Sequence, residues 1–320
     1  MSEETTLDRN LTIEAVRVTE AAAIAAAEVM GRGDEKAADQ AAVDAMRNAL
    51  NRLHMAGTVV IGEGERDQAP MLFIGEEVGT GKGPKIDIAL DPLEGTTITA
   101  KGMPNGLAVL ALAESGMLLN APDVYMDKIA AGPLVPADAI DLDYSAGENI
   151  ANVAKALGKS AKDVVACILD RPRHGELIAA VRAAGARIVL IGDGDVAGVM
   201  ATAMPETGID IYMGTGGAPE GVLAAAALRC IGGNIQGRLL FRNDDERGRA
   251  AKVGVKDLNR KYEITDLAAG DVIFAATGVT DGNMLHGVRR TATTLSTESV
   301  AMRARTGTVR WIRMQRPVGE

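Results

Sequence analysis

The sequence predicts an α/β protein with a layered α+β architecture and two subdomains. Between residues 164 and 231, strand-like apolar runs alternate regularly with helix-like segments. This β-α-β-α alternation implies parallel strands joined by right-handed crossovers. The chain has 320 residues, 47 % apolar and 2 % aromatic, so it can bury a sizeable core of small aliphatic side chains. Its 37 glycines indicate many tight turns, as is common in α/β enzymes.

The apolar spacing also predicts the order of the elements. The first half is expected to hold helices at 8–30, 34–55 and 69–78, and strands at 58–61, 86–90 and 107–112. The second half is expected to hold strands at 164–169, 187–191, 209–213, 235–241 and 271–276, and helices at 175–184, 195–203 and 219–231. A loop-like stretch before residue 150 predicts an N-terminal metal-binding α+β subdomain, 1–150, and a C-terminal α/β substrate-binding subdomain, 151–320.

Charge and cysteine content restrict the possible functions. The net charge is −9 and no basic run occurs, which argues against a nucleic-acid or anionic-membrane surface. Cys167 and Cys230 stand far apart in apolar surroundings and are expected to be reduced core residues. The three histidines show no metal-ligand spacing, so carboxylates would bind any metal. No signal-peptide-like segment and no apolar run of about 18 residues occurs, and a cytoplasmic location is expected.

One turn organises the predicted site. Alternating apolar residues before it predict a strand, which Asp91-Pro92 is expected to end because proline donates no ladder hydrogen bond. Gly95 then allows a tight turn, and either Thr96 or Thr97 is able to cap the segment that follows. Asp91 and Glu94 are thereby held beside hydroxyl groups at the end of a buried strand. Such oxygen ligands suit Mg²⁺ or Mn²⁺, although a β-turn with a helix cap is the simpler alternative.

Three more carboxylates occupy comparable positions. Glu63 follows a predicted strand and lies between two glycines, which let other groups approach it closely. Glu220 lies at the start of a predicted helix, and Asp39 lies one turn into another, where a solvent-exposed first-turn acid is the simpler interpretation. Converging carboxylates raise one another's pKa unless cations neutralise them, so two or more divalent ions are expected. Such ions would bridge a phosphate, activate water and stabilise the leaving oxygen.

The loops after the later strands carry further polar side chains. Because the carboxyl ends of parallel strands meet at one edge of a sheet, these loops are expected to bind a ligand. Arg171 and Arg173 suit a second phosphate, and Asp193 and Asp195 suit sugar hydroxyls. Taken singly, the arginines are also consistent with surface charges, the two aspartates with a plain turn, and Tyr125 with a packed aromatic residue.

Several motifs, in this order, carry a resemblance to a known family. They are Gly31-Arg-Gly-Asp34, Ile61-Gly-Glu-Gly-Glu65, Ala69-Pro-Met-Leu72, Asp91-Pro-Leu-Glu-Gly-Thr96, Arg171-Pro-Arg-His174, Asp193-Gly-Asp195 and Gly216-Gly-Ala-Pro-Glu-Gly221. The Asp91 motif resembles the Asp-Pro-Ile/Leu-Asp-Gly-Thr signature of the lithium-sensitive phosphatase superfamily, which includes the inositol monophosphatases, with glutamate at the fourth position. The whole series closely resembles the class II fructose-1,6-bisphosphatases of bacteria.

The resemblance implies alternating α-β-α-β-α layers and a metal-dependent site. It assigns Asp39 and Glu63 to one metal and Asp91, Glu94 and Glu220 to the others, which reverses the local interpretation of Asp39. Two or more Mn²⁺ or Mg²⁺ ions per site are implied. Catalytic roles are implied for Glu63, Asp91 and Thr96, with Thr96 orienting the attacking water. Substrate contacts are implied for Glu94, Gly95, Thr96, Tyr125, Arg171, Pro172, Arg173, Asp193, Gly194, Asp195 and Gly217.

The implied activity is hydrolysis of the 1-phosphate of fructose 1,6-bisphosphate, in gluconeogenesis or a carbon-fixation cycle, by a homodimer or homotetramer. The expected partner is a small sugar bisphosphate, not nucleic acid or membrane. Two alternatives stay open: an enzyme that also accepts sedoheptulose 1,7-bisphosphate, and a non-catalytic sugar-phosphate sensor. The sensor would need a broken metal set, and all five acids are present. A nucleotide-dependent oxidoreductase is disfavoured because no Gly-x-Gly-x-x-Gly follows a first strand with an acid about twenty residues later.

Overall fold

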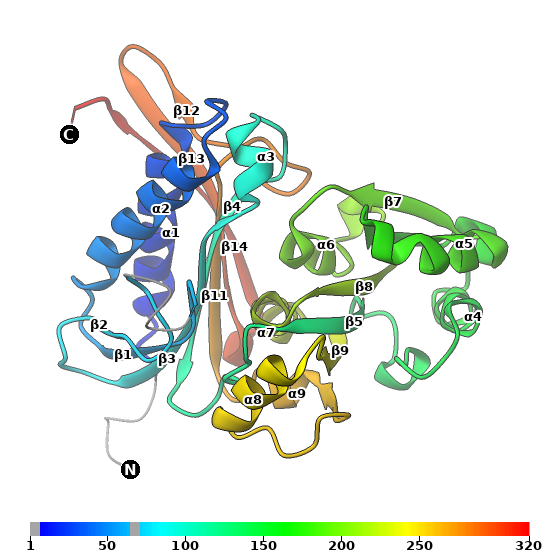
Figure 1. The fold of residues 1–320 in the computed structure, drawn as a ribbon. Coiled ribbons are helices and arrows are strands. Elements are labelled where there is room, and N and C mark those ends of the chain that lie inside the picture. Colours follow the sequence, from blue (N-terminus) through cyan, green and yellow to red (C-terminus); the bar gives the residue numbers. More distant parts are fainter. Residues whose placement is uncertain (1–6, 65–70, 320) are drawn as a thin grey trace. The chain divides into compact units, whose positions relative to one another are not determined.

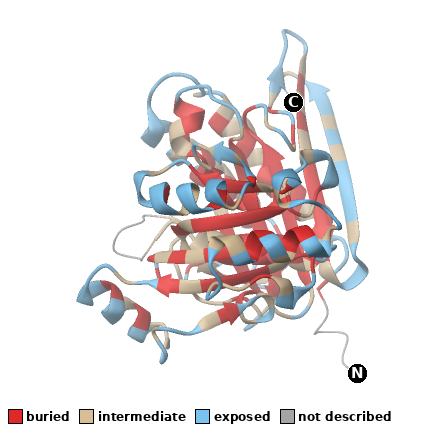
Figure 2. Ribbon diagram, turned by 90° about the vertical axis from the view of Figure 1, so that its right-hand side faces the viewer, coloured by how far each residue is buried: buried red, intermediate tan, exposed pale blue. Residues whose placement is uncertain are grey.

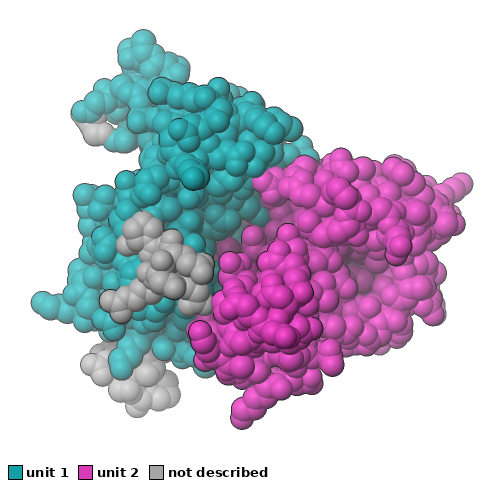
Figure 3. All heavy atoms as spheres, viewed as in Figure 1, with its two compact units in different colours: residues 1–118, 270–320 teal, residues 119–269 magenta. Residues whose placement is uncertain are grey.

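The computed structural model describes residues 7–64 and 71–319. The chain divides into two compact units (Figure 1 and Figure 3). Unit 1 comprises residues 1–118 and 270–320, and unit 2 comprises residues 119–269. Each unit is built on its own β-sheet and carries its own helices. This arrangement confirms the predicted α/β class.

Unit 1 is organised around an eight-stranded sheet. The strand order is β12 (Arg289–Arg290), β13 (Thr294–Arg303), β11 (Val272–Gly278), β4 (Leu107–Glu114), β3 (Lys85–Glu94), β1 (Ala56–Ile61) and β2 (Glu77–Val78), with β14 (Thr308–Pro317) paired to β13. Of the strand pairs that the described residues form in this sheet, only β1 and β3 run parallel. Helices α1 (Leu11–Ala27) and α2 (Glu35–Leu50) pack against each other, and α1 lies against β4, β11 and β13 (Figure 1).

Helix α2 shows how the sequence sets a boundary. Asp34 caps its start by accepting a hydrogen bond from the Ala37 N–H at 3.0 Å. The helix ends at Leu50, although the apolar pattern predicts it to residue 55. Leu53 and Met55 are buried in the core from the following turn, so their apolar character imitates a continued helical stripe.

Two other predictions in unit 1 were wrong. Strand β3 does not stop at Pro92 but continues to Glu94, with a bulge in its pairing to β4 where the proline is tolerated. The described part of the predicted helix 69–78 is not helical and ends in β2, while residues 69 and 70 lie outside the described residues. The buried Glu76 carboxylate fixes this segment by accepting hydrogen bonds from the Leu72 N–H and, at 2.5 Å, from Arg47 Nε.

Unit 2 contains a six-stranded sheet. The strand order is β10 (Lys261–Glu263), β9 (Asn234–Leu240), β5 (Tyr125–Ala131), β8 (Ile211–Gly217), β6 (Val165–Leu169) and β7 (Arg187–Ile191). Its helices are α4 (Ala146–Ala156), α5 (Gly175–Ala183), α6 (Asp195–Ala201), α7 (Ala218–Ile231), α8 (Asp244–Lys252) and α9 (Ile264–Leu267). The predicted parallel alternation is confirmed for β6, β7 and β8, whereas β5, β9 and β10 pair antiparallel.

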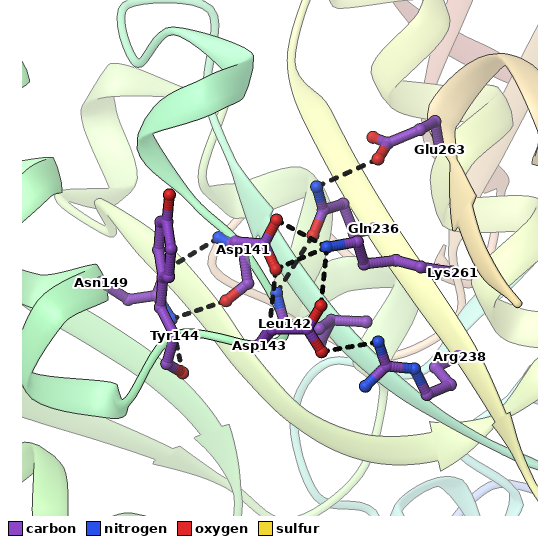
Figure 4. A network of polar contacts seen from close by, with 9 residues as sticks. All are labelled: Asp141, Leu142, Asp143, Tyr144, Asn149, Gln236, Arg238, Lys261 and Glu263. Carbon is purple, nitrogen blue, oxygen red and sulfur yellow. Dashed lines mark hydrogen bonds and ion pairs between the residues drawn. The ribbon is translucent and has the colours of Figure 1, made fainter. Parts of the chain in front are cut away.

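The division into units differs from the single boundary expected at residue 150. That position lies inside α4, and β11, β13 and β14 complete the sheet of unit 1. The loop before α4 is bound to the unit 2 sheet by a polar network (Figure 4). In this network Lys261 Nζ donates to both Asp141 carboxylate oxygens at 2.6 Å, and Arg238 donates to Asp143 at 2.7 Å. A loop-like composition therefore does not mark a boundary here.

The central strands of both sheets are largely buried, as the red segments in Figure 2 show, whereas the edge strands β7 and β14 contain no buried residue. Strand β4 is buried from Leu107 to Ala113, which confirms the expectation of a strand covered on both faces. Cys167 and Cys230 are buried and free, as predicted, and burial raises the pKa of Cys167 to about 12. Among the described residues, no helix has both the length and the apolar character needed to cross a membrane.

Candidate active site

Glu63 and Asp39 interact electrostatically in unit 1. Glu63 follows β1 by two residues, and Asp39 is half-buried on α2. Burial, and then the negative charge of Asp39, raise the pKa of Glu63 from 4.5 to about 8. Burial also raises the pKa of Asp39. The local interpretation of Asp39 as a solvent-exposed acid is therefore wrong, while a metal-binding role for it stays a prediction.

Gly62 explains how the chain holds Glu63 in place. A Cβ atom at Gly62 would lie 2.0 Å from the carbonyl oxygen of Leu72, so a side chain is excluded there. The Glu63 N–H donates to that same carbonyl at 3.0 Å. On the other side, Gly64 has a φ of 135°, a conformation that residues with side chains rarely adopt. The tight backbone expected around Glu63 is present, while the close approach of other groups to its carboxylate stays a prediction.

The Asp91 motif comprises the last four residues of β3, then Gly95, and then Thr96, the first residue of α3 (Thr96–Ala100). The Leu93 N–H donates to Asp91 Oδ1 at 3.0 Å, which fixes this carboxylate beside the bulge of β3. Glu94 ends the strand and is buried. Gly95 follows with a φ of 92°, and Thr96 is the first residue of α3. The junction of β3 and α3 thus holds two carboxylates, of Asp91 and Glu94, and the Thr96 hydroxyl on a backbone fixed by a strand and a helix.

Lys128 lies at the centre of the predicted site residues of unit 2. Its side chain is fully buried on β5 and forms an ion pair with Asp195. Its Nζ also donates to the carbonyl oxygen of Gly217 at 2.8 Å. Sequence reasoning did not assign Lys128 to the site. The available signal was a lysine among apolar residues in a strand, because a buried ammonium group needs a partner.

Glu220 is the predicted metal ligand of unit 2, in the first turn of α7. Burial and the charge of Asp195 raise its pKa to about 7, against the opposing effect of Lys128. Its Oε2 atom is shielded from solvent and accepts no hydrogen bond from the described residues. A Cβ atom at Gly217 would lie 1.9 Å from this oxygen, so glycine makes room for the carboxylate. An oxygen buried in this way is suited to a cation.

The Arg171–Arg173 loop contacts two other predicted site residues. Arg171 lies 3.7 Å from Asp193 in a long ion pair. Arg173 donates two hydrogen bonds to the carbonyl oxygen of Thr215, at 2.6 and 3.0 Å. The guanidinium groups of Arg173 and Arg242 each lie 4.9 Å from the centre of the Tyr125 ring. Tyr125 is therefore surrounded by positive charge, as suits a phosphate-binding surface.

His174 anchors this loop and was not predicted as a site residue. It is buried, and its Nε2 accepts a hydrogen bond from the Thr215 N–H at 2.8 Å. Nδ1 must then carry the proton that bridges to the Leu169 carbonyl oxygen, 2.7 Å away. A neutral histidine thus joins the ends of β6 and β8 beside Arg173. The absence of metal-ligand spacing in the sequence does not reveal such a structural role.

The structure brings predicted residues together in several places, and one of them is the ion pair of Arg171 with Asp193. Asp39 interacts with Glu63, and the residues from Asp91 to Thr96 lie at the junction of β3 and α3. Arg173 contacts Tyr125, while Lys128 connects Asp195 with Gly217. Across residues 7–64 and 71–319, no three His, Cys, Asp or Glu side chains form a group that could hold a metal ion. The assignment of all five acids to one metal cluster therefore stays a prediction.

Comparison with known proteins identifies the family. The family model described as "Bacterial fructose-1,6-bisphosphatase, glpX-encoded" matches residues 9–316. The fructose-1,6-bisphosphatase 1 class 2 of Escherichia coli strain K12 is 46 % identical over 318 residues, covering 95 % of this chain and 94 % of that protein. The fructose-1,6-bisphosphatase class 2 of Shigella flexneri has the same identity and coverage.

A solved structure, an extragenic suppressor from Pyrococcus furiosus, shows a distant likeness. It is 15 % identical with a TM-score of 0.33, over 61 % of this chain and 72 % of that chain, which is too low to support an argument. By contrast, the family model and the two relatives match almost the whole sequence. The chain belongs to the bacterial class 2 fructose-1,6-bisphosphatases.

Proposed function

We propose that the protein hydrolyses the 1-phosphate of D-fructose 1,6-bisphosphate, releasing fructose 6-phosphate and inorganic phosphate. The observation that carries this proposal is the family match over residues 9–316, which spans every predicted site residue. The acidic residues of unit 1 and the arginine-rich loop of unit 2 have the chemistry that a bisphosphate substrate requires. The Asp91 motif further supports placement in the lithium-sensitive phosphatase superfamily.

The carboxylates fit divalent cations. Burial, and after it the negative charge of Asp39, raise the pKa of Glu63 to about 8, and a bound cation would offset both effects. Glu220 offers a buried oxygen with no hydrogen-bond donor among the described residues. Asp39 and Glu63 would hold one ion, and Asp91, Glu94 and Glu220 the others, with Mn²⁺ or Mg²⁺ suited to such oxygen ligands. When bound, these ions supply electrostatic stabilisation of the phosphoryl group and lower the pKa of water.

Thr96 and the unit 2 loops would orient the reactants. The Thr96 hydroxyl, held at the first position of α3, would orient the attacking water for in-line displacement. Arg171 and Arg173 would bind the second phosphate through charge-assisted hydrogen bonds, beside Tyr125. The segment from Asp193 to Asp195 would accept hydrogen bonds from the sugar hydroxyls, and Gly217 would contact the substrate through its backbone.

The resemblance also supports three further proposals. The protein would work in the cytoplasm, as a homodimer or homotetramer, and would serve gluconeogenesis or a carbon-fixation cycle. Light scattering after size-exclusion chromatography would measure the assembly. A monomeric mass for the active enzyme would contradict the proposed oligomer without affecting the proposed chemistry.

Product analysis with controlled metal content tests the proposed reaction. The purified protein is treated with chelator, reloaded with Mg²⁺ or Mn²⁺, and incubated with fructose 1,6-bisphosphate, and ³¹P NMR identifies the remaining sugar phosphate. We expect fructose 6-phosphate as the product, with turnover that chelator abolishes and either cation restores. Fructose 1-phosphate as product would contradict the proposed regiochemistry, and full turnover in chelator would contradict metal dependence.

A further inference from the structure

We infer that Lys128 is a positioning residue that holds the two sugar-binding loops of unit 2 in register; this inference rests on the proposed function. Lys128 lies in the middle of β5 with an exposure of 1 %, an extreme burial for an ammonium group. Its cross-strand partners are Gly214 on β8 and Gly237 on β9. The glycine that leaves space beside the lysine stem is Gly221 in α7, where a Cβ atom would lie 3.3 Å from Lys128 Cδ.

The ammonium group joins two separate loops. One partner is the Asp195 carboxylate, at the start of α6, and the other is the Gly217 carbonyl oxygen, 2.8 Å away at the end of β8. The first loop carries the aspartates proposed to bind sugar hydroxyls, and the second leads into α7. Gly216 makes room for the ion pair between Lys128 and Asp195. A Cβ atom at this position would lie 2.2 Å from Asp195 Oδ2 and 3.0 Å from Lys128 Nζ.

A purely stabilising role explains this arrangement poorly. A buried ion pair is expensive to desolvate, and well-packed apolar residues often replace one without loss of stability. Another ion pair of unit 2, Lys159 with Asp210 at 2.6 Å, lies outside the strands; its lysine is partly exposed and neither residue belongs to the proposed site. Lys128 is fully buried, and its two partners lie in different loops of the proposed site. These contacts point to a role in fixing the position of one loop relative to the other.

This role predicts a specific kinetic signature. Without the ammonium group, Asp195 and Gly217 lose their common anchor, so substrate binding weakens while the residues of unit 1 keep their own contacts. We expect Lys128→Met to raise the KM for fructose 1,6-bisphosphate by about tenfold or more, since sub-ångström misplacement of binding groups is costly. Partial unfolding would instead lower the apparent kcat with KM unchanged, because the folded fraction would retain a normal site.

The experiment compares the wild type, Lys128→Met, Gly216→Ala and Lys159→Met. Each variant is first checked by urea unfolding, and then kcat and KM are measured with fructose 1,6-bisphosphate. We expect raised KM in the first two variants, and wild-type kcat and KM in Lys159→Met, which removes an ion pair outside the site. If Lys128→Met does not fold, the KM of Gly216→Ala tests the positioning role instead, because this variant disturbs the same ion pair while keeping both charges.

Three outcomes would overturn the inference. The first is wild-type KM in folded Lys128→Met or, where that variant does not fold, in Gly216→Ala. The second is an equal rise of KM in Lys159→Met. The third is an inactive wild-type enzyme, which would overturn the proposed function and this inference with it. Active wild type with unaffected KM in the variants would refute the role of Lys128 alone.

Discussion

Replacement of Gly217 by alanine tests the role of Glu220 by adding one methyl group. The new Cβ would lie 1.9 Å from Glu220 Oε2, 2.6 Å from Cδ and 2.8 Å from Oε1. Ordinary contact begins at 3.4 Å, so the carboxylate must move by 3.4 − 1.9 = 1.5 Å or more. The backbone at Gly217 has φ −65° and ψ 146°, which alanine adopts without strain. The clash is therefore confined to the end of one flexible side chain.

The expected effect is large on catalysis and small on stability. A displacement of about 1 Å in a catalytic group typically costs about 100-fold in rate, so we expect kcat/KM to fall at least that far. Alanine reduces the entropy of the unfolded chain, which offsets part of the cost of displacing the Glu220 side chain, so the free energy of unfolding should fall by about 1 kcal/mol. Mn²⁺ binding, measured by calorimetry, should weaken in parallel, because Glu220 is proposed to be a metal ligand.

Gly192→Ala is the matched control. Gly192 precedes the Asp193 to Asp195 segment, and a Cβ there meets no atom within 4 Å. This variant should retain wild-type kcat/KM and metal affinity. The reasoning would be refuted if Gly217→Ala kept kcat/KM within about threefold of the wild type, a change of less than about 0.7 kcal/mol, or if the control lost as much activity.

Two further predictions concern the carboxylates of unit 1. Asp91→Asn should lose most turnover while its urea midpoint stays close to that of the wild type, and wild-type kcat in this variant would remove Asp91 from the mechanism. In chelator, the free energy of unfolding should decrease as pH rises from about 4.5 to about 8, because folded Glu63 keeps a proton that the unfolded chain loses near 4.5. Urea titrations across this range should show a weaker decrease for Glu63→Gln, and an identical decrease would contradict the raised pKa.

Local chemistry made much of the fold predictable. Strand β7 lies at the residues expected, and α5 and α7 differ from prediction by one residue at one end, because regular apolar alternation determines each element on its own. The rest depends on long-range pairing. Strand β11 pairs with β4 across more than 150 residues of sequence, and nothing in its apolar run indicates that partner. The assignment of residues 270–320 to unit 1 follows from this pairing.

Some residues of the candidate site were likewise predictable from the sequence, whereas others depend on contacts that only the fold creates. Gly95 was predictable, because the tight turn after Glu94 needs its positive φ, whereas Gly62 makes room for the Leu72 carbonyl oxygen, a contact that the sequence does not name. Asp39 was misjudged from local spacing, since its burial comes from tertiary packing near Glu63. Lys128 and His174 act through partners that lie more than 40 residues away along the chain, so only the folded sheet reveals their contacts.

A comparison of three substrates directly tests the proposal that the enzyme hydrolyses a sugar bisphosphate and binds its second phosphate. With Mg²⁺ or Mn²⁺ present, kcat/KM is measured for fructose 1,6-bisphosphate, sedoheptulose 1,7-bisphosphate and inositol 1-phosphate. The account predicts efficient turnover of the fructose substrate and at least about 100-fold less of the inositol ester, which lacks the second phosphate that Arg171 and Arg173 are proposed to bind. Comparable turnover of sedoheptulose 1,7-bisphosphate would extend the specificity to both sugars. Turnover of inositol 1-phosphate alone, or of none of the three, would contradict the account.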